Sequence, residues 1–298
     1  MNSITLKLNE NQINKLINTY KDNLNSKIPQ YAKYLLIVEN CRITVYNSNK
    51  VLFQGKDALI YASAFDSSLV EENKNKKEKS KKIPNNPNSL VNTAGSDEVG
   101  TGDYFGPVVV CAAIVTKEDI SKLESYNITD SKKLTDEYIL EIAPKIMKFI
   151  KYSCLVLGNK KYNEIHKKYN LNAIKAILHN QVYLNLAKSN QMPKYCYVDQ
   201  FAAKPLYFRY LNDQPEIYKD LIFETKAESK YIAVAVASMI ARYTFLIKWE
   251  EINKFYEIDF HKGAGDKVNK DAIKFVEKYG RNRLNEVAKV HFKNTDLI

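Results

Sequence analysis

The strongest constraint on the fold is a series of short apolar runs that alternate with helical segments after residue 93. Continuous apolar runs of about four to eight residues are typical of strands that are buried on both faces. Together with a leading hairpin, such runs separated by helices predict a mixed α/β sheet with helices on its faces. The predicted strands are Ala94–Asp97, Val108–Val115, Phe149–Leu157, Tyr195–Asp199 and Leu221–Thr225.

One predicted helix, Tyr231–Trp249, is apolar nearly all round its circumference. A helix without a polar face is buried in a core. Ala233, Ala237 and Ala241 recur at i, i+4 spacing and would let the helix lie close against the sheet.

The chain divides into two predicted domains. Residues 71–93 are rich in lysine and asparagine, contain two prolines and show no hydrophobic period, which is typical of a linker. Residues 1–70 open with the alternating run ITLKL, followed by an amphipathic helix capped by Asn9 and Gln12, three further strand-like pieces and a short helix at Ala58–Phe65. We expect an antiparallel sheet backed by helices that binds a partner, and a larger domain at 94–298.

The composition is that of a soluble globular protein, with 45% hydrophobic and 27% charged residues. No uninterrupted apolar run approaches the ~18–20 residues of a membrane span, and the first residues lack the layout of a signal peptide. We therefore expect a cytoplasmic protein with no membrane partner. The four cysteines are far apart in strand-like runs, and we expect each of them to be a buried, reduced thiol: Cys41, Cys111, Cys154 and Cys196.

The net charge of +11 and the pI near 9.2 favour a polyanionic partner, because basic surfaces attract phosphate backbones. Compositional drift toward lysine, without any binding face, is the alternative. The lysines of 71–93 likewise either touch phosphate or belong to a solvated tether. Charge alone leaves both questions open.

Candidate catalytic acids follow the predicted strands. Asp97 and Glu98 lie in the glycine-rich stretch GSDEVGTGDYFGP at 95–107, and Asp199 follows the run YCYV. Neighbours on a regular strand point to opposite faces, so Asp97 and Glu98 share a site only if the strand ends or kinks there, which the glycines permit. Glu228 lies between a strand and the buried helix, where the alternative is an exposed acid in the helix's first turn.

Four carboxylates delivered to one crevice would repel each other and raise their pKa values. Divalent cations remove that conflict, and Mg²⁺ suits a site of few carboxylates plus water and substrate phosphate. Two such ions about 4 Å apart stabilise both oxygens of an in-line phosphoryl displacement. The sequence contains no Walker loop, serine elbow or histidine base that would compete for the role.

The larger domain resembles the ribonuclease HII/HIII family, and the HIII branch in particular. The resemblance rests on motifs that cover the domain in order, and ITVYNSNKVLFQGK at 43–56 resembles the extra amino-terminal domain of the HIII branch. The motifs are GSDEVGTGDYFGP (95–107), DSKKL (130–134), YNEIHKKYNLNAIKAILHN (162–180), VDQF (198–201), TKAESKYIAVAVASMIARY (225–243), KGAG (262–265) and HFKNT (291–295).

This resemblance implies a ribonuclease H-like fold with a small α+β TATA-binding-protein-like domain that helps to hold the substrate. It implies endonucleolytic cleavage of the RNA strand of RNA/DNA hybrids, leaving a 5′-phosphate and a 3′-hydroxyl. Two Mg²⁺ or Mn²⁺ ions would serve, one activating water and one supporting the departing oxygen, and no obligate protein partner is implied. The implied metal-binding acids are Asp97, Glu98, Asp199 and Glu228.

Substrate contacts are assigned to Gly100, Thr101 and Gly102, since residues without bulk allow close approach to the 2′-hydroxyl that distinguishes RNA. Ribonuclease HII typically has arginine at the position of Thr101 and aspartate at that of Glu228, so both departures agree with the HIII branch. The HII preference for RNA–DNA junctions is therefore not carried over.

Several motif residues have two open interpretations. Ser131 and Lys132 contact phosphate, or Asp130 and Ser131 cap the following helix. Tyr104 and Phe105 stack on a sugar or base, or pack internally. Ile174, Ile177 and Leu178 are predicted to be core residues by their spacing, and His179 and Asn180 are interpreted as structural.

Two rival functions remain open. Another metal nuclease of the same fold, of the resolvase or transposase kind, would use similar carboxylates on DNA, but without the GTG and TKAES surroundings. A protein that binds hybrids without cleaving them would not need four intact acids.

Overall fold

The computed structural model describes residues 3–66, 92–126, 128 and 134–298. The chain forms two compact units. The first contains the amino-terminal part of the chain and also Phe201–Tyr210, and the second contains the remainder. The predicted contacts of Ser131 and Lys132, and most of the predicted linker, lie outside the described residues.

The amino-terminal part of the first unit is a four-stranded antiparallel sheet in the order β1-β4-β3-β2, together with helices α1 and α2. The predicted capping box is confirmed, because Asn9 and Gln12 each accept a hydrogen bond from the other's main-chain N–H at 2.9 Å. The short helix is three residues shorter than predicted. The elements are β1 (Ser3–Lys7), α1 (Glu10–Thr19), β2 (Ala32–Val38), β3 (Cys41–Tyr46), β4 (Lys50–Gly55) and α2 (Ala58–Ala62).

A segment remote in sequence completes the core of this unit. Helix α8 (Lys204–Tyr210) and the residues just before it join the apolar cluster of the first unit through Ala202, Ala203 and Leu206. Arg209 of α8 also forms a two-pronged ion pair with the buried Asp57. The hydrogen bond from Arg209 lowers the pKa of Asp57.

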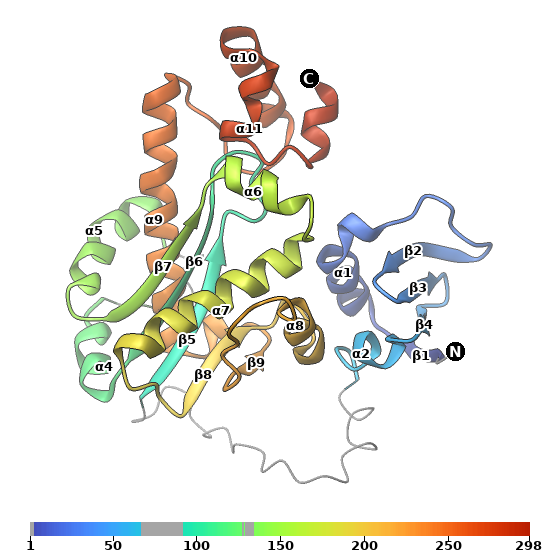
Figure 1. Ribbon diagram of the computed structural model, residues 1–298, viewed down its shortest axis with the longest axis horizontal. Coiled ribbons are helices and arrows are strands. Elements are labelled where there is room, and N and C mark those ends of the chain that lie inside the picture. The colour runs from blue at the N-terminus through green and yellow to red at the C-terminus, as the bar shows by residue number, and fades with distance from the viewer. Residues whose placement is uncertain (1–2, 67–91, 127, 129–133) are drawn as a thin grey trace. The chain divides into compact units, whose positions relative to one another are not determined.

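The second unit contains a five-stranded mixed sheet in the order β7-β6-β5-β8-β9, which confirms the predicted fold class. Strands β5, β6 and β7 are antiparallel, whereas β8 and β9 run parallel to β5. The carboxyl ends of β5, β8 and β9 therefore lie at one edge (Figure 1). The strands are β5 (Thr93–Val99), β6 (Val108–Val115), β7 (Lys151–Leu157), β8 (Tyr195–Asp199) and β9 (Ile222–Glu224).

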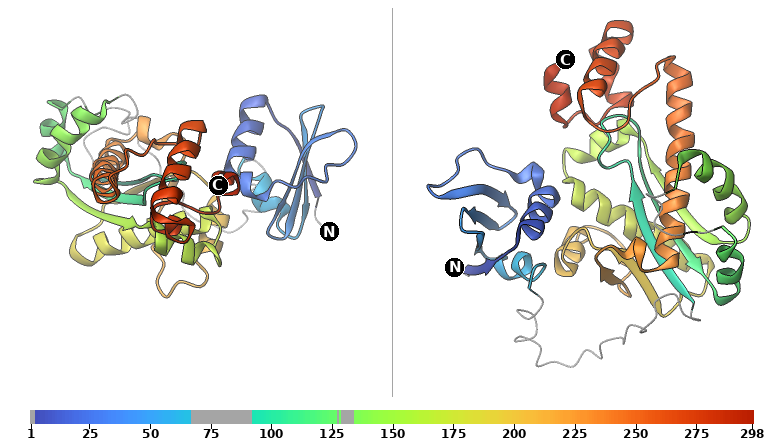
Figure 2. Two further views of the ribbon diagram at one scale, coloured as in Figure 1. Left: turned by 90° about the horizontal axis from the view of Figure 1, so that it is seen from above. Right: turned by 180° about the vertical axis from the view of Figure 1, so that it is seen from behind.

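Helices cover both faces of this sheet (Figures 1 and 2). On one face α9 (Ile232–Tyr256) packs so closely that a Cβ on Gly95 would lie 2.4 Å from the nitrogen of Val234. The other face is covered by α7 (Leu171–Ser189). The remaining helices are α4 (Lys117–Glu124), α5 (Asp136–Met147), α6 (Asn159–His166), α10 (Asp266–Tyr279) and α11 (Leu284–Val287).

Helix α9 is the predicted buried helix, and Ala233, Ala237 and Ala241 are fully buried in it. Among the described residues it is long and apolar enough, by length and composition, to cross a membrane, which its interrupted apolar sequence had not suggested. However, 67% of its most apolar window is buried inside the protein. The helix is therefore the core helix of the α/β unit.

The prediction of four reduced thiols is wrong for two of them. Cys111 of β6 and Cys154 of β7 are bonded as a disulfide, whereas Cys41 and Cys196 are free and buried. The two bonded residues are directly opposite each other in the antiparallel pair, with a Cα–Cα distance of 4.2 Å. Sequence spacing could not reveal this, because it depends on the register between strands.

Candidate active site at the carboxyl ends of the central strands

Strand β5 carries the first two acids on opposite faces of the sheet. No kink occurs at the two acids, because β5 stays paired with β6 through Val99; the strand ends there, one residue after Glu98, and the chain turns at Gly100, where φ is 92°. Asp97 accordingly faces α9, and Glu98 faces α7. The pairing of β5 with β8 ends at Ser96, so both acids lie where the sheet opens on that side.

Glu98 lies between two basic side chains of α7. Lys175 Nζ is 2.5 Å from Oε1, and His179 Nε2 is 2.9 Å from Oε2. The other ring nitrogen of His179 is 2.7 Å from the hydroxyl of Ser96. Burial alone raises the pKa of Glu98, but Lys175 and His179 outweigh it and lower the value to about 2. Glu98 is thus held ionised in one orientation.

Helix α7 buries different residues from those predicted. Ile174 is buried as expected, but Ile177 and Leu178 are only partly buried, whereas Lys175 and His179 lie inside. His179 was predicted to be structural, and its bonds to Glu98 and Ser96 specify that role, whereas the contact of Lys175 with Glu98 was not predicted. The available signal was a lysine and a histidine four residues apart in the helix, a spacing that places both on one face.

Asp97 is buried and surrounded by like charge. Burial, the charge of Glu98 and the charge of Glu228 raise its pKa to about 8. Hydrogen bonds from Ser238 of α9 and from the main-chain N–H of Glu98, at 2.8 Å, act in the opposite direction. Ser238 was also missed, although it is the first polar residue of an apolar helix.

Asp199 ends β8, beside β5. Ser96 pairs with Val198 in this parallel pair, so Asp97 and Asp199 are the next residues on each strand and point to the same face. Asp199 Oδ1 accepts a hydrogen bond from the N–H of Ala227 at 3.0 Å. That bond ties the end of β8 to the turn that carries Glu228.

Glu228 is 6% exposed and lies in a single 3₁₀ turn, η3 (Ala227–Ser229), ahead of α9. The turn is possible because Lys226 adopts the left-handed conformation, with φ 55°. An exposed acid in the first turn of the long helix is therefore excluded. The charge of Glu228 acts directly on Asp97, which puts the two in one neighbourhood.

The acidic cluster comprises Asp97, Glu98, Asp199 and Glu228, which lie near the ends of β5 and β8 and in the turn before α9. Asp97, Glu98 and Asp199 each accept hydrogen bonds from protein donors. Within the described part of the chain, no three His, Cys, Asp or Glu side chains are already arranged to hold a metal ion. The donor chemistry nevertheless fits a hard divalent cation, because buried like-charged carboxylates need a compensating charge.

The loop after β5 contains the predicted substrate contacts. Gly100 requires glycine, because a Cβ there would lie 2.2 Å from the carbonyl oxygen of Pro107. Gly102 is exposed, and a Cβ there would meet no atom within 4 Å, so it presents open main chain. Tyr104 and Phe105 are fully buried, which resolves their open interpretation in favour of packing.

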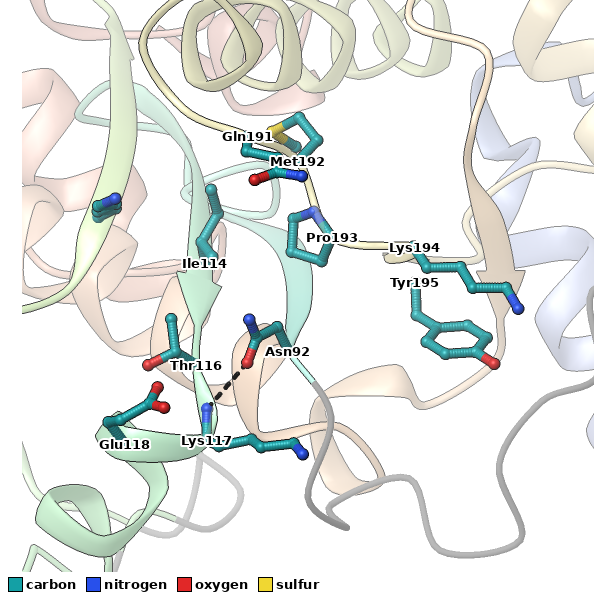
Figure 3. Close-up of a pocket in the computed structure, with 11 residues that line it drawn as sticks. Asn92, Ile114, Thr116, Lys117, Glu118, Gln191, Met192, Pro193, Lys194 and Tyr195 are labelled. Atoms are coloured by element: carbon teal, nitrogen blue, oxygen red, sulfur yellow. Dashed lines mark hydrogen bonds between the residues drawn. The ribbon is translucent and has the colours of Figure 1, made fainter.

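A hollow of about 840 Å³ lies elsewhere in the second unit, at the amino ends of β5 and β8 (Figure 3). Glu118 is the only carboxylate among its lining residues. The side chain of Lys194 points away from Glu118 in the close-up. This hollow therefore lacks the several carboxylates of a metal site.

A mixed sheet with acids at the ends of β5 and β8 defines the class, a ribonuclease H-like α/β protein. The family model described as Ribonuclease HII matches residues 94–295, and a model described as a domain of unknown function matches residues 3–80.

Proteins with similar sequences identify the family within this class. Ribonuclease HIII of Bacillus mycoides is 39% identical over 302 residues, and that of Staphylococcus aureus is 38% identical over 312 residues. Each match covers 99% of this chain and 97% of the relative. The chain therefore belongs to the ribonuclease HIII family of endoribonucleases.

Solved structures agree with this assignment. The crystal structure of Bst-RNase HIII in complex with Mn²⁺ matches with a TM-score of 0.68 at 33% identity, covering 99% of this chain and 97% of the other. Aquifex aeolicus RNase H3 matches with a TM-score of 0.54 at 23% identity, covering 97% of this chain and 99% of the other. At that identity the second match is a likeness of fold.

Proposed function

We propose that this protein hydrolyses the RNA strand of RNA/DNA hybrids endonucleolytically, leaving 5′-phosphate and 3′-hydroxyl ends. Membership of the ribonuclease HIII family supports the reaction. The observation that carries the choice of site is the burial of Asp97 and Glu228, together with the register of β5 and β8 that puts Asp97 and Asp199 at matching positions on one face of the sheet. We assign metal binding and catalysis to Asp97, Glu98, Asp199 and Glu228.

The proposed cofactor is Mg²⁺ or Mn²⁺, two ions together with substrate. Both prefer carboxylate oxygens, and a relative has been crystallised with Mn²⁺. When bound, the ions supply positive charge for an in-line displacement at the scissile phosphate.

The residues around the acids orient them before any ion binds. Lys175 and His179 hold Glu98, Ser238 and a main-chain N–H hold Asp97, and the N–H of Ala227 holds Asp199. Such supporting contacts restrict the rotamers of the ligands and reduce the ordering needed on binding.

The proposed substrate contacts distinguish RNA from DNA. Gly100, Thr101 and Gly102 lie next to Asp97 and Glu98 in sequence, and the exposed main chain at Gly102 offers room for a sugar 2′-hydroxyl. Ser131 and Lys132 are proposed to contact phosphate.

We assign hybrid binding to the first unit as well. Its strand register puts Lys7 opposite Lys50, and Arg42 opposite Gln54, at exposed positions on one face of the sheet. Three cations on one face suit a phosphate backbone. We expect the protein to act in the cytoplasm, without a membrane partner or an obligate protein partner.

An end-labelled RNA/DNA hybrid tests this proposal directly. Digestion with Mg²⁺ or Mn²⁺, but not with chelator, should cut the RNA strand internally and leave fragments that carry a 5′-phosphate. A DNA duplex of the same sequence serves as the control substrate.

The Asp97→Asn variant separates the rival functions. Loss of cleavage with retained hybrid binding supports the assignment. Unchanged cleavage would show that Asp97 is not catalytic, and cleavage of the DNA duplex by the wild-type protein would favour a different nuclease of the same fold.

A further inference from the structure

The loop between β5 and β6 forms hydrogen bonds with two segments from the carboxyl-terminal part of the chain. Asp103 Oδ1 accepts from the N–H of Gly263 at 2.6 Å, and the N–H of Tyr104 donates to the carbonyl of Gly263 at 2.8 Å. The N–H of Gly106 donates to the carbonyl of Val287 at 3.0 Å. These contacts involve the KGAG motif and the residues just before the HFKNT motif. Neither motif has been given a role at the four acids.

Lys289 forms further hydrogen bonds with the same loop. Its Nζ donates to three carbonyl oxygens of the loop, those of Asp103 at 2.7 Å, Phe105 at 3.3 Å and Gly106 at 2.6 Å. Its main-chain N–H donates to the carbonyl of Tyr104 at 2.8 Å. One residue thus binds four consecutive positions of the loop.

The side chain of Lys289 is fully buried, and the ring of Tyr162 lies 5.9 Å from its amino group. Burial lowers its pKa to about 7, although the charge of Asp103 acts in the opposite direction. A buried ammonium group is expensive unless it is hydrogen-bonded. Here the three hydrogen bonds of the amino group all go to main-chain carbonyls of the loop. The buried amino group therefore stabilises the main-chain conformation of the loop.

We propose that Lys289 is a positioning residue for substrate recognition, which fixes the main chain of Gly100, Thr101 and Gly102 against the ribose of the RNA strand. This inference rests on the proposed function. Lys289 binds the loop directly after Gly102, whereas β5 is held by its own pairing with β6. Replacing the lysine should therefore affect the recognition of ribose and leave the acids in place.

The test compares two equilibrium constants in an Asp97→Asn background, in which the bound hybrid stays intact. Dissociation constants are measured by fluorescence anisotropy for an RNA/DNA hybrid and for a DNA duplex of the same sequence. Lys289→Met should weaken hybrid binding about tenfold, the size expected when charged hydrogen bonds are removed, and leave duplex binding unchanged.

Lys161→Met is the matched control, because it removes a lysine from an exposed pair with Glu164 on the nearby α6. It should change neither constant by more than about twofold. If Lys289→Met weakens the binding of hybrid and duplex equally, or changes neither dissociation constant, the inference is wrong. Equal weakening would mean that the lysine only stabilises the unit.

A second variant and a second readout keep the inference testable if Lys289→Met folds poorly. Asn159→Ala removes the other side-chain donor to the carbonyl of Gly106, at 2.9 Å, and should lower the hybrid preference in the same direction. Amide hydrogen exchange of a peptide over 98–107 should speed up in either variant while β6 stays protected. If the wild-type protein fails to cleave hybrids, the proposed function is wrong. Unchanged hydrogen exchange over 98–107 in the variants would separately show that Lys289 does not fix the loop.

Discussion

Asp97 and Glu98 are neighbours in β5, yet their surroundings move their pKa values in opposite directions. Burial and two acidic neighbours raise the pKa of Asp97 to about 8, whereas two basic neighbours lower that of Glu98 to about 2 despite burial. The difference arises because successive residues of a strand face different helices. The sequence could identify the two acids, but not which helix each would meet.

Asp97 gives the metal-free protein a characteristic pH dependence. A folded-state pKa near 8, above the unfolded value of 3.8, means that the native state holds a proton that the unfolded state releases between these values. Stability should therefore fall as pH rises from about 4 to about 8. Asp97→Asn should stabilise the protein in chelator by about 1–2 kcal/mol at about pH 8, and by less at about pH 5. Urea unfolding at the two pH values measures this, and an equal gain at both would contradict it.

Lys175 provides a test of the pair with Glu98. Lys175→Met leaves a carboxylate that is only 14% exposed without one of its two basic partners, which should destabilise the protein by about 3 kcal/mol. Adding Glu98→Gln should recover much of that loss, because the uncompensated charge is then gone. A loss below about 0.5 kcal/mol in chemical denaturation would argue that the pair contributes little.

The two glycines of the loop should respond differently to a methyl group. Gly100→Ala forces a side chain into the left-handed region and against the carbonyl of Pro107, so we expect a loss of about 2–4 kcal/mol in the free energy of unfolding. Gly102→Ala meets open space and should leave stability unchanged, while raising KM for the hybrid. Thermal unfolding and steady-state kinetics of both variants would check this, and an equal stability loss would not fit.

At the scale of elements, apolar periodicity was enough to predict the strands and the buried helix α9, because a strand or helix buried on all sides carries its signal in consecutive residues. Helix α8 was not predicted as part of the first unit. It lies shortly after Asp199 in sequence, and its membership depends on Leu206 and Arg209 meeting residues about 150 positions earlier. No local pattern reports such a contact.

Leu206 tests this assignment. Leu206→Ala should leave a cavity in the first unit and destabilise it by about 2–4 kcal/mol, although the residue is remote in sequence from the strands β3 and β4. Hydrogen exchange of peptides from β3 and β4 should then speed up. Lys204→Ala, at an exposed position of the same helix, is the control and should leave exchange unchanged. Unaltered protection in Leu206→Ala would remove α8 from this core.

The membership of α8 in this core also bears on deletion experiments. Removing the amino-terminal residues would uncover the apolar side chains of 201–206, which pack in the first unit. Point substitutions on the sheet surface are therefore the better test of what this unit binds.

For the whole molecule, the net charge of +11 left open whether the basic residues form a binding face. The strand register, which the sequence does not encode locally, puts Lys7, Arg42 and Lys50 at exposed positions on one face of the sheet. Changing all three to glutamine should flatten the dependence of log affinity on log salt by about one unit for each phosphate that is no longer neutralised, with kcat unchanged.

The control for this prediction is a matched triple change to glutamine at Lys117, Lys122 and Lys148, which are exposed in the second unit. These lysines lie on α4 and at the end of α5, so the control protein should keep the wild-type salt slope. Equal slopes for the wild-type protein and both triple variants would exclude the basic face of the first unit as a phosphate-binding surface.

The limits of the sequence are clearest in the disulfide and the acidic cluster. Strand-end acids were predictable because strands and turns leave local signals, but their partners on α7 and α9 required the packed structure. The Cys111–Cys154 pair likewise depends on the register between β6 and β7.

The proposed function depends most on acids from separate strands sharing divalent ions. Anomalous diffraction from crystals grown with Mn²⁺ and a non-cleavable hybrid tests this most directly. We predict a Mn²⁺ peak at direct ligand distance from Asp97 and from at least one of Asp199 and Glu228. A Mn²⁺ peak at other residues would contradict the shared site. The absence of any Mn²⁺ peak, with Glu98 still paired with Lys175 and His179, would contradict it as well.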